Sequence, residues 1–137
     1  MPERPFKVEI VTPERVMITR DDVVSLVVPG AEGSLGILAG HAPILAELSV
    51  GVIWMRSADG AVTRLAASGG FMEVKRNVAR ILADTAELAE EIDIARAQEA
   101  VRRAEERLHE QKTDIDMARA QAALNRAMNR LRVARGE

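Results

Sequence analysis

The sequence predicts a β + α protein, with an N-terminal β-sandwich followed by a C-terminal antiparallel two-helix hairpin. From Phe6 to about Ala83, apolar residues alternate with polar ones or gather in short β-rich runs, which is typical of strands. After Asp84 the apolar residues recur every three or four positions instead, which is typical of amphipathic helices. We therefore expect a sandwich domain in residues 1–85 and a helical hairpin in residues 86–137.

The strand character is clearest in Phe6–Ile10, where apolar residues alternate with Lys7 and Glu9. Asp59-Gly60 and Arg76-Asn77 are expected to turn two hairpins. Many short strands without an intervening helix favour a sandwich or a barrel. Aliphatic side chains and Trp54 must fill its core, because aromatic residues are few. The other β-rich runs are residues 23–28, 50–55, 62–67, 71–75 and 78–82.

Two helices are expected at about residues 93–109 and 114–135. Asp93 can cap the first helix, Thr113 or Asp114 can cap the second, and Gly136 suits the C-terminal end. The polar link between the helices is short, so they should fold back on each other with a turn near Lys112.

The seam between these helices is rich in alanine. Alanine allows close approach but buries little apolar surface, so the hairpin should be marginally stable alone. An element of this kind suits a switch, which needs two arrangements separated by only a few kcal/mol. The expected seam residues are Ile94, Ala97, Val101, Ala104, Leu108, Met117, Ala120, Leu124, Ala127, Leu131 and Ala134.

The composition excludes several kinds of site. The chain has no cysteine and only two histidines, His41 and His109, whose spacing does not pair them, so thiol chemistry is excluded and a metal site is disfavoured. No apolar run is long enough to span a membrane and the first residues lack a secretion signal, so we expect a soluble, unexported protein. The glycine-rich segment Gly30–Gly36 lacks the lysine of a phosphate loop, and a turn with a positive φ is the better interpretation. Ser68-Gly69-Gly70 is not a nucleophile elbow, and no catalytic constellation was found.

Five segments, in order along the whole chain, resemble the epsilon subunits of bacterial F-type ATP synthases. That family implies a ten-stranded β-sandwich followed by two α-helices. The chain departs from the family at Ala39, where proline is common, and at Ser34, where an acidic residue is frequent. The segments that carry the resemblance are Val8–Pro13, Gly33–Pro43, Ser68–Val74, Ile92–Ala97 and Leu124–Leu131.

The resemblance implies a non-catalytic rotor subunit, peripheral to the cytoplasmic face of the bacterial plasma membrane. The sandwich would bind the gamma subunit and stand on the c-ring, coupling rotation, with Glu32, Ser34 and His41 in a loop that faces the c-ring. The alternative for this segment is an ordinary β-turn with a satisfied His41.

The last helix carries an excess of arginine, with no acidic residue between Met117 and Gly136. The resemblance implies that the hairpin can extend toward the alpha and beta subunits of the catalytic head, where this helix would block ATP hydrolysis by charge complementarity. The alternative is a solvated arginine face. The arginines are Arg119, Arg126, Arg130, Arg132 and Arg135.

In some relatives the folded hairpin binds ATP. The antiparallel arrangement would bring Arg96 level with about Met128, near Arg126 and Arg130, and arginines near a helix N-terminus can bind an anion. Alternatively, Asp93 only caps and the arginines only pair with Glu87, Glu90 and Glu91. ATP is thus a candidate regulatory ligand, magnesium is left open, and no cofactor is required. The positions that correspond to the ATP site are Glu87, Asp93, Arg96, Ala97, Arg126 and Arg130, with Arg103 a weaker candidate.

A free-standing nucleotide-sensing module, or a nucleic-acid-binding hairpin, is the alternative class. The arginines fit either one. However, the absence of tyrosine, the single Trp54 and the net charge of -2 provide no stacking platform for nucleic acid. We therefore expect protein partners and no nucleic acid.

Overall fold

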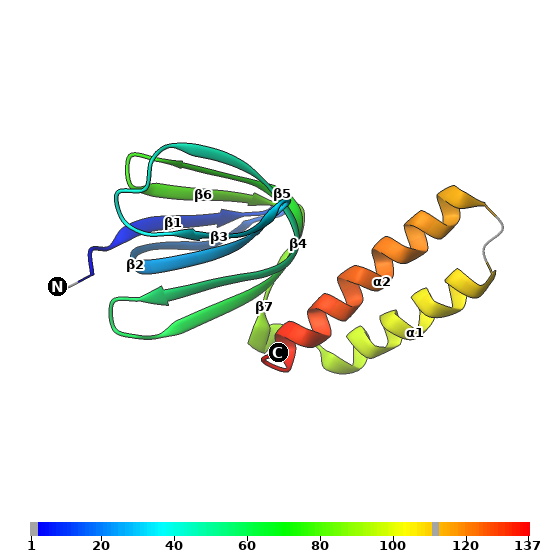
Figure 1. Ribbon diagram of the computed structural model, residues 1–137. Helices are drawn as coiled ribbons and strands as arrows, with labels where there is room; N and C mark the ends of the chain where they lie inside the picture. Colours follow the sequence, from blue (N-terminus) through cyan, green and yellow to red (C-terminus); the bar gives the residue numbers. More distant parts are fainter. Residues whose placement is uncertain (1–2, 111–112) are drawn as a thin grey trace. The chain divides into compact units, whose positions relative to one another are not determined.

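The computed structural model describes residues 3–110 and 113–137, and it divides the chain into two compact units after Leu88 (Figure 1). The predicted boundary lay after residue 85. Residues 86–88 stay with the first unit because they form a short strand that pairs with the sheet, and because Ala86 and Leu88 pack against its core. Each unit is described separately below.

The first unit contains seven strands in the described residues, not the ten that were expected. The number differs because three strands are long and continuous, each 14 or 15 residues. The strands are β1 (Phe6–Val11), β2 (Val16–Gly30), β3 (Gly33–Ile37), β4 (Ile44–Ser57), β5 (Val62–Lys75), β6 (Val78–Ala83) and β7 (Ala86–Leu88).

Two of the long strands, β2 and β5, change pairing partners along their length. The first half of β2, up to Val23, pairs with β1, and its second half pairs with β3 and β4. Likewise β5 pairs with β7 through residues 65–67 and with β6 through residues 70–75. The strand order is β1-β6-β5-β4-β2-β3, and an additional β1–β2 pairing closes the sheet on itself.

The core of this unit is aliphatic. Ile10, Ile53, Leu65 and Ile81 are fully buried, as the alternation in their strands predicts. Trp54 was expected in the core, but it is only half-buried. It follows Ile53 and precedes the buried Met55, so its side chain points to the opposite face of β4.

Two predicted turns are confirmed. Gly60 has a positive φ of 89°, and the Asp59 carboxylate accepts a hydrogen bond from the Ala61 N–H at 2.9 Å. Arg76 and Asn77 both have positive φ, which is the type I′ geometry of a two-residue hairpin. The Asn77 side chain also accepts from the N–H of Gly40 and donates to the carbonyl of Pro5, so this turn fixes two neighbouring segments.

The second unit contains a short 3₁₀ helix, η1 (Ala89–Glu91), followed by α1 (Ile94–Glu110) and α2 (Asp114–Ala134). The Asp93 carboxylate accepts from the Arg96 N–H at 3.1 Å, and the Thr113 hydroxyl accepts from the Asp116 N–H at 3.2 Å. Both N-caps are therefore as predicted. The predicted turn near Lys112 lies outside the described residues.

Helix α2 ends at a glycine with a positive φ. Gly136 has a φ of 77°, its N–H donates to the Val133 carbonyl, and the Glu137 N–H donates to the Arg132 carbonyl. These two bonds form a Schellman motif.

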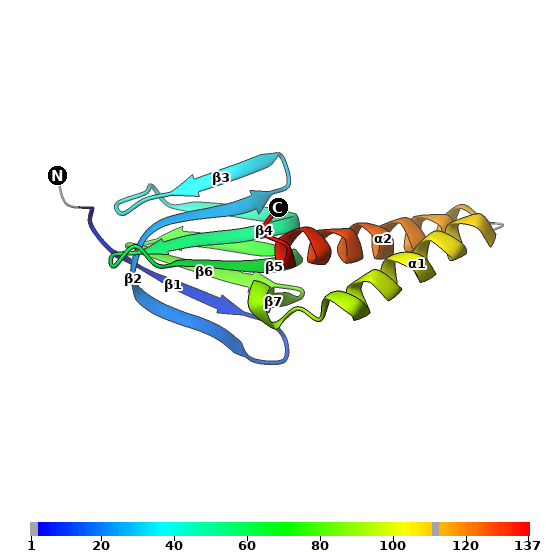
Figure 2. The ribbon, with the colours of Figure 1, turned by 90° about the horizontal axis from the view of Figure 1, so that it is seen from below.

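Helices α1 and α2 lie side by side (Figures 1 and 2). The predicted seam is buried mainly at its alanines, whereas Ile94 and Met117 are exposed. No helix among the described residues has the length and apolar character to cross a membrane. The buried alanines of the seam are Ala97, Ala104, Ala120 and Ala127.

Candidate functional site

The segment from Glu32 to Pro43 is not a single loop. Glu32, its first residue, turns a hairpin together with the preceding Ala31, and Gly33 follows with a positive φ of 135°. Ser34 then lies within β3, and His41 lies beyond the far end of that strand. Glu32 and Ser34 are therefore neighbours, whereas the length of β3 separates them from His41. The His41 ring has its Nδ1 atom 2.6 Å from the Ala42 carbonyl.

A groove of about 510 Å³ lies between β3 and the beginning of β4. Three partly buried side chains, Leu35, Ile44 and Ala46, line it and pack against the core. Glu32 and Glu47 give it acidic groups. This groove was not predicted, because no local motif in the sequence indicates that β3 and the beginning of β4 become neighbours. The lining residues are Gly30–Leu35 and Ile44–Glu47.

The residues predicted to bind ATP have different environments. Arg96, Arg103 and Arg126 are exposed, Arg130 is half-buried, and the Ala97 side chain is fully buried. Within the described residues, no ion pair involves Arg96, Arg103 or Arg126. The Asp93 carboxylate is used by its helix cap. Glu87 belongs to β7, in the other unit.

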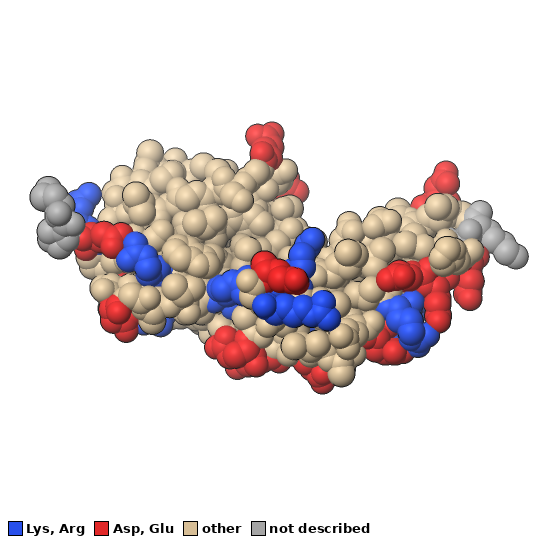
Figure 3. All heavy atoms as spheres, turned by 60° about the horizontal axis from the view of Figure 1, so that its bottom comes forward, with Lys and Arg blue, Asp and Glu red and all other residues tan. Residues whose placement is uncertain are grey.

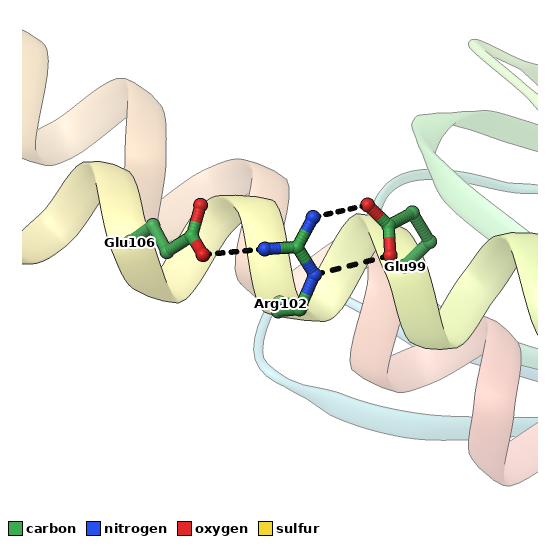
Figure 4. Close-up of polar contacts among 3 residues, drawn as sticks. All are labelled: Glu99, Arg102 and Glu106. Atoms are coloured by element: carbon green, nitrogen blue, oxygen red, sulfur yellow. Dashed lines mark hydrogen bonds and ion pairs between the residues drawn. The ribbon is translucent and has the colours of Figure 1, made fainter.

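Arg102, which was not among the predicted site residues, forms two ion pairs on the hairpin. Its guanidinium contacts Glu99 and Glu106, three and four residues away on α1 (Figure 4). The Nε of Arg102 donates to Glu99 at 3.1 Å. This hydrogen bond lowers the pKa of Glu99 below its usual value and raises the pKa of Arg102. The spacing of the three residues was a usable signal.

Two shallow grooves on the hairpin contain further arginines. Arg107 lines both of them, together with Arg119 and Asp116 in a groove of about 190 Å³ and with Arg103 in one of about 260 Å³. Ala120 of α2 lines the first groove and Ala123 of α2 lines the second. Arg107 therefore lies beside this part of α2. The sequence analysis missed Arg107, whose position on the helix face next to Arg103 could have indicated it.

The predicted basic character of α2 is present at its surface. Arg119, Arg126, Arg132 and Arg135 are exposed. Acidic groups lie beside basic ones on the visible surface of the hairpin, at the right of Figure 3. Among the described residues, no group of three or more histidine, aspartate or glutamate side chains could hold a metal ion.

These features define a two-part chain in which a closed β-sandwich carries a peripheral groove and a separate helical hairpin carries exposed arginines. Residues 5–89 match the family model for the β-sandwich domain of ATP synthase delta/epsilon chains, and residues 90–135 match the model for their long α-helix domain. The chain belongs to the ATP synthase delta/epsilon chain family, and is thus a non-catalytic subunit.

Relatives with similar sequences have the same family name. The chain is 50% identical over 108 residues to the ATP synthase epsilon chain of Syntrophomonas wolfei, an alignment that covers 79% of this chain and 78% of the relative. It is 52% identical over 103 residues to the epsilon chain of Symbiobacterium thermophilum, covering 75% of this chain and 73% of the relative.

Solved structures share the fold at lower identity. A chain in the mitochondrial ATP synthase of Euglena gracilis, solved as OSCP/F1/c-ring, matches with a TM-score of 0.82 and 21% identity, covering 94% of this chain and 81% of that one. A chain in the central stalk/c-ring of the Tetrahymena thermophila enzyme matches with a TM-score of 0.66 and 15% identity, covering 98% and 99%.

Proposed function

We propose that this chain is the epsilon subunit of the central stalk of a bacterial F-type ATP synthase, at the cytoplasmic face of the plasma membrane. The match of both units, in order, to the two domains of the family carries this proposal. The sandwich binds the gamma subunit and rests on the c-ring, so that it transmits rotation. Both solved assemblies with this fold contain a c-ring, which supports a rotor location.

Affinity purification of the tagged chain from its native host tests this assignment. We expect the gamma subunit and the c-ring to be recovered with it in fixed proportion. Recovery of the chain alone, from cells whose ATP synthase is intact, would favour the free-standing nucleotide-sensing module instead.

The second part of the proposal is that α2 restrains ATP hydrolysis. In an extended hairpin, its arginines would meet acidic segments of the alpha and beta subunits, and opposite charges steer and hold such contacts. The exposure of Arg126 and Arg132 supports this role. Removal of residues 112–137 should raise ATP hydrolysis by the reconstituted enzyme. Each of the single variants Arg126→Gln and Arg132→Gln should raise it partly, whereas Arg107→Gln on α1 serves as the charge-matched control.

The third part is that ATP binds the folded hairpin through Arg96, Arg126 and Arg130, with Arg103 close to the same surface. Arg96 and Arg126 are exposed and carry no ion pair in the described chain, so a phosphate group can reach both. A ligand that binds only the folded form stabilises it by about 2.7 kcal/mol at 100 times its dissociation constant. That free energy is enough to decide a marginal equilibrium.

Calorimetric titration with ATP, with and without magnesium, tests this third part. Arg126→Ala is a cleaner variant than Asp93→Ala, because Asp93 also caps α1. Heat of binding that is lost in Arg126→Ala but kept in Arg132→Ala would support the site. The absence of heat at millimolar ATP would leave a stalk subunit whose inhibition does not depend on ATP.

A further inference from the structure

The outer edge of β3 is open. β3 is the last strand in the sheet order and pairs with β2 on one side; in the described part of the chain, no strand pairs with its other side (Figure 2). Proteins usually protect such an edge with charged residues, proline or a bulge. The run Gly33–Ile37 contains none of these.

The register shows which backbone groups this edge presents. Pro29 pairs with Ser34, and proline has no N–H, so this is a non-hydrogen-bonded pair of the ladder. In agreement, the Pro29 carbonyl accepts a hydrogen bond from the Ser49 hydroxyl of β4 at 3.3 Å. By alternation, the N–H and C=O groups of Ser34 and Gly36 point away from β2. A Cβ atom at Gly36 would meet no atom within 4 Å, so the face of β3 at Gly36 is also open.

The groove lies beside this edge and has a second strand along its other wall. Among the described residues, the first part of β4 pairs only with β5. On its opposite side, the Glu47 carbonyl accepts from the Ala31 N–H at 2.9 Å. By alternation, the backbone groups of Leu45 face the groove as well. The groove therefore combines unpaired backbone, the apolar side chains of Leu35 and Ile44, and acidic groups.

We propose that an extended segment of a neighbouring stalk subunit adds to β3 as a further strand and occupies this groove. Main-chain hydrogen bonds to Ser34 and Gly36 supply affinity, and alternate side chains supply specificity, as in other cases of strand addition. The segment places apolar side chains over Leu35 and a lysine or arginine beside Glu32 and Glu47. This inference rests on the proposed function, which supplies the source of the partner segment.

Proline substitutions test the strand pairing directly. Ser34→Pro and Gly36→Pro remove N–H groups that β2 does not use, and edge strands tolerate proline at such positions. Each variant should bind at least roughly tenfold more weakly to ATP synthase purified without this chain, because a hydrogen bond is lost and the ring obstructs the edge. The matched controls Ser34→Ala and Gly36→Ala keep the N–H and should bind like the wild type. Glu32→Gln/Glu47→Gln should weaken binding by a smaller factor and reduce its dependence on salt.

The outcomes separate the inference from the proposed function. If the wild-type chain does not rebind the enzyme, the proposed function is wrong. If it rebinds and the proline variants bind equally well, only the strand addition is wrong. If a proline variant does not fold, hydrogen exchange of the wild-type amides of Ser34 and Gly36 decides: strong protection upon assembly supports the inference, and unchanged exchange overturns it. Self-association of the isolated chain that Gly36→Pro abolishes would also overturn it, because the occupant would then be a second copy.

Discussion

The sandwich and the hairpin fill their interiors with side chains of different sizes. Large aliphatic residues such as Ile53, Leu65 and Ile81 are fully buried in the sandwich. The buried residues between α1 and α2 are mostly alanines, such as Ala104 and Ala120. Full burial of a leucine or isoleucine side chain contributes about 1.5–3 kcal/mol. A single buried carbon, such as the one in the alanine side chain, contributes only about 0.8 kcal/mol. Each seam layer of the hairpin therefore gains less than a layer of the sandwich.

This difference indicates a division of roles within one chain. The sandwich also closes its sheet through the β1–β2 pairing, so few of its backbone groups depend on a partner. The hairpin has an alanine-rich seam and capped helices, so we expect its opening to cost less free energy than unfolding of the sandwich. The sandwich is therefore suited to serve as a rigid platform. The hairpin is suited to serve as an element whose conformation a ligand can change.

The largest expected effect comes from the sandwich core. Ile81→Ala should lower the free energy of unfolding by about 2–5 kcal/mol, because it removes buried carbons and leaves a cavity. Urea denaturation followed by circular dichroism measures this change. The matched variant Leu124→Ala, at a half-buried seam position, should cost clearly less. An equal loss of the free energy of unfolding in the two variants would show that the seam is packed as tightly as the sandwich core.

Overpacking the seam should open the hairpin without affecting the sandwich. Ala104 is 3% exposed, and a leucine at that position adds three carbons where the helices approach closely. We expect a cost of about 1–3 kcal/mol, visible as faster hydrogen exchange of the α1 amides while the β-strand amides keep their rates. Ala95→Leu, on the exposed face of α1, is the control. A stabilised hairpin in Ala104→Leu would mean that the seam contains unfilled space.

The cap of α2 should have a smaller effect. Thr113→Ala removes the hydroxyl that accepts from the Asp116 N–H, and loss of such a cap costs about 0.5–2 kcal/mol. Thermal melting of helicity should shift downward in Thr113→Ala and remain almost unchanged in Thr113→Ser, which keeps the hydroxyl. A similar shift in both variants would assign the effect to the methyl group of Thr113 instead.

The smallest effect is a dependence on pH. The hydrogen bond from Arg102 lowers the pKa of Glu99 in the folded hairpin below its ordinary value of 4.5. Its contribution to stability is therefore complete above pH 4.5 and is lost as the pH falls through the lowered pKa of the folded state. Helicity titrated from pH 7 to pH 3 should decline less steeply in Arg102→Gln. Identical titration curves would show that the ion pairs do not contribute to folding.

The sequence predicted local features of the fold well. The alternation in Phe6–Ile10, the turn at Arg76-Asn77 and the caps at Asp93 and Thr113 each depend on a few neighbouring residues, so a local pattern carried enough information. The number of strands was wrong because continuity is not a local property. Ser68-Gly69-Gly70 was expected to separate two strands, yet the positive φ values of its glycines let β5 continue through it.

The site was harder to predict, because it depends on which strands become neighbours. The segment Gly33–Ile37 contains two glycines and no clear alternation, so its strand β3 was not expected. The groove beside β3 requires β4 to diverge from β2, which no motif encodes. The Glu99–Arg102–Glu106 contacts, in contrast, follow from helical spacing alone. The predicted roles of the hairpin arginines remain predictions.

The position of Trp54 gives the molecule separate optical signals for its two units. Trp54 lies in β4, the chain has no tyrosine, and its two phenylalanines are Phe6 and Phe71. All tryptophan and phenylalanine side chains therefore belong to the sandwich. Tryptophan emission reports the sandwich alone, whereas the helical far-ultraviolet dichroic signal of α1 and α2 reports mainly the hairpin. A single unmodified sample can thus reveal whether the two units unfold together or in sequence, without any attached label.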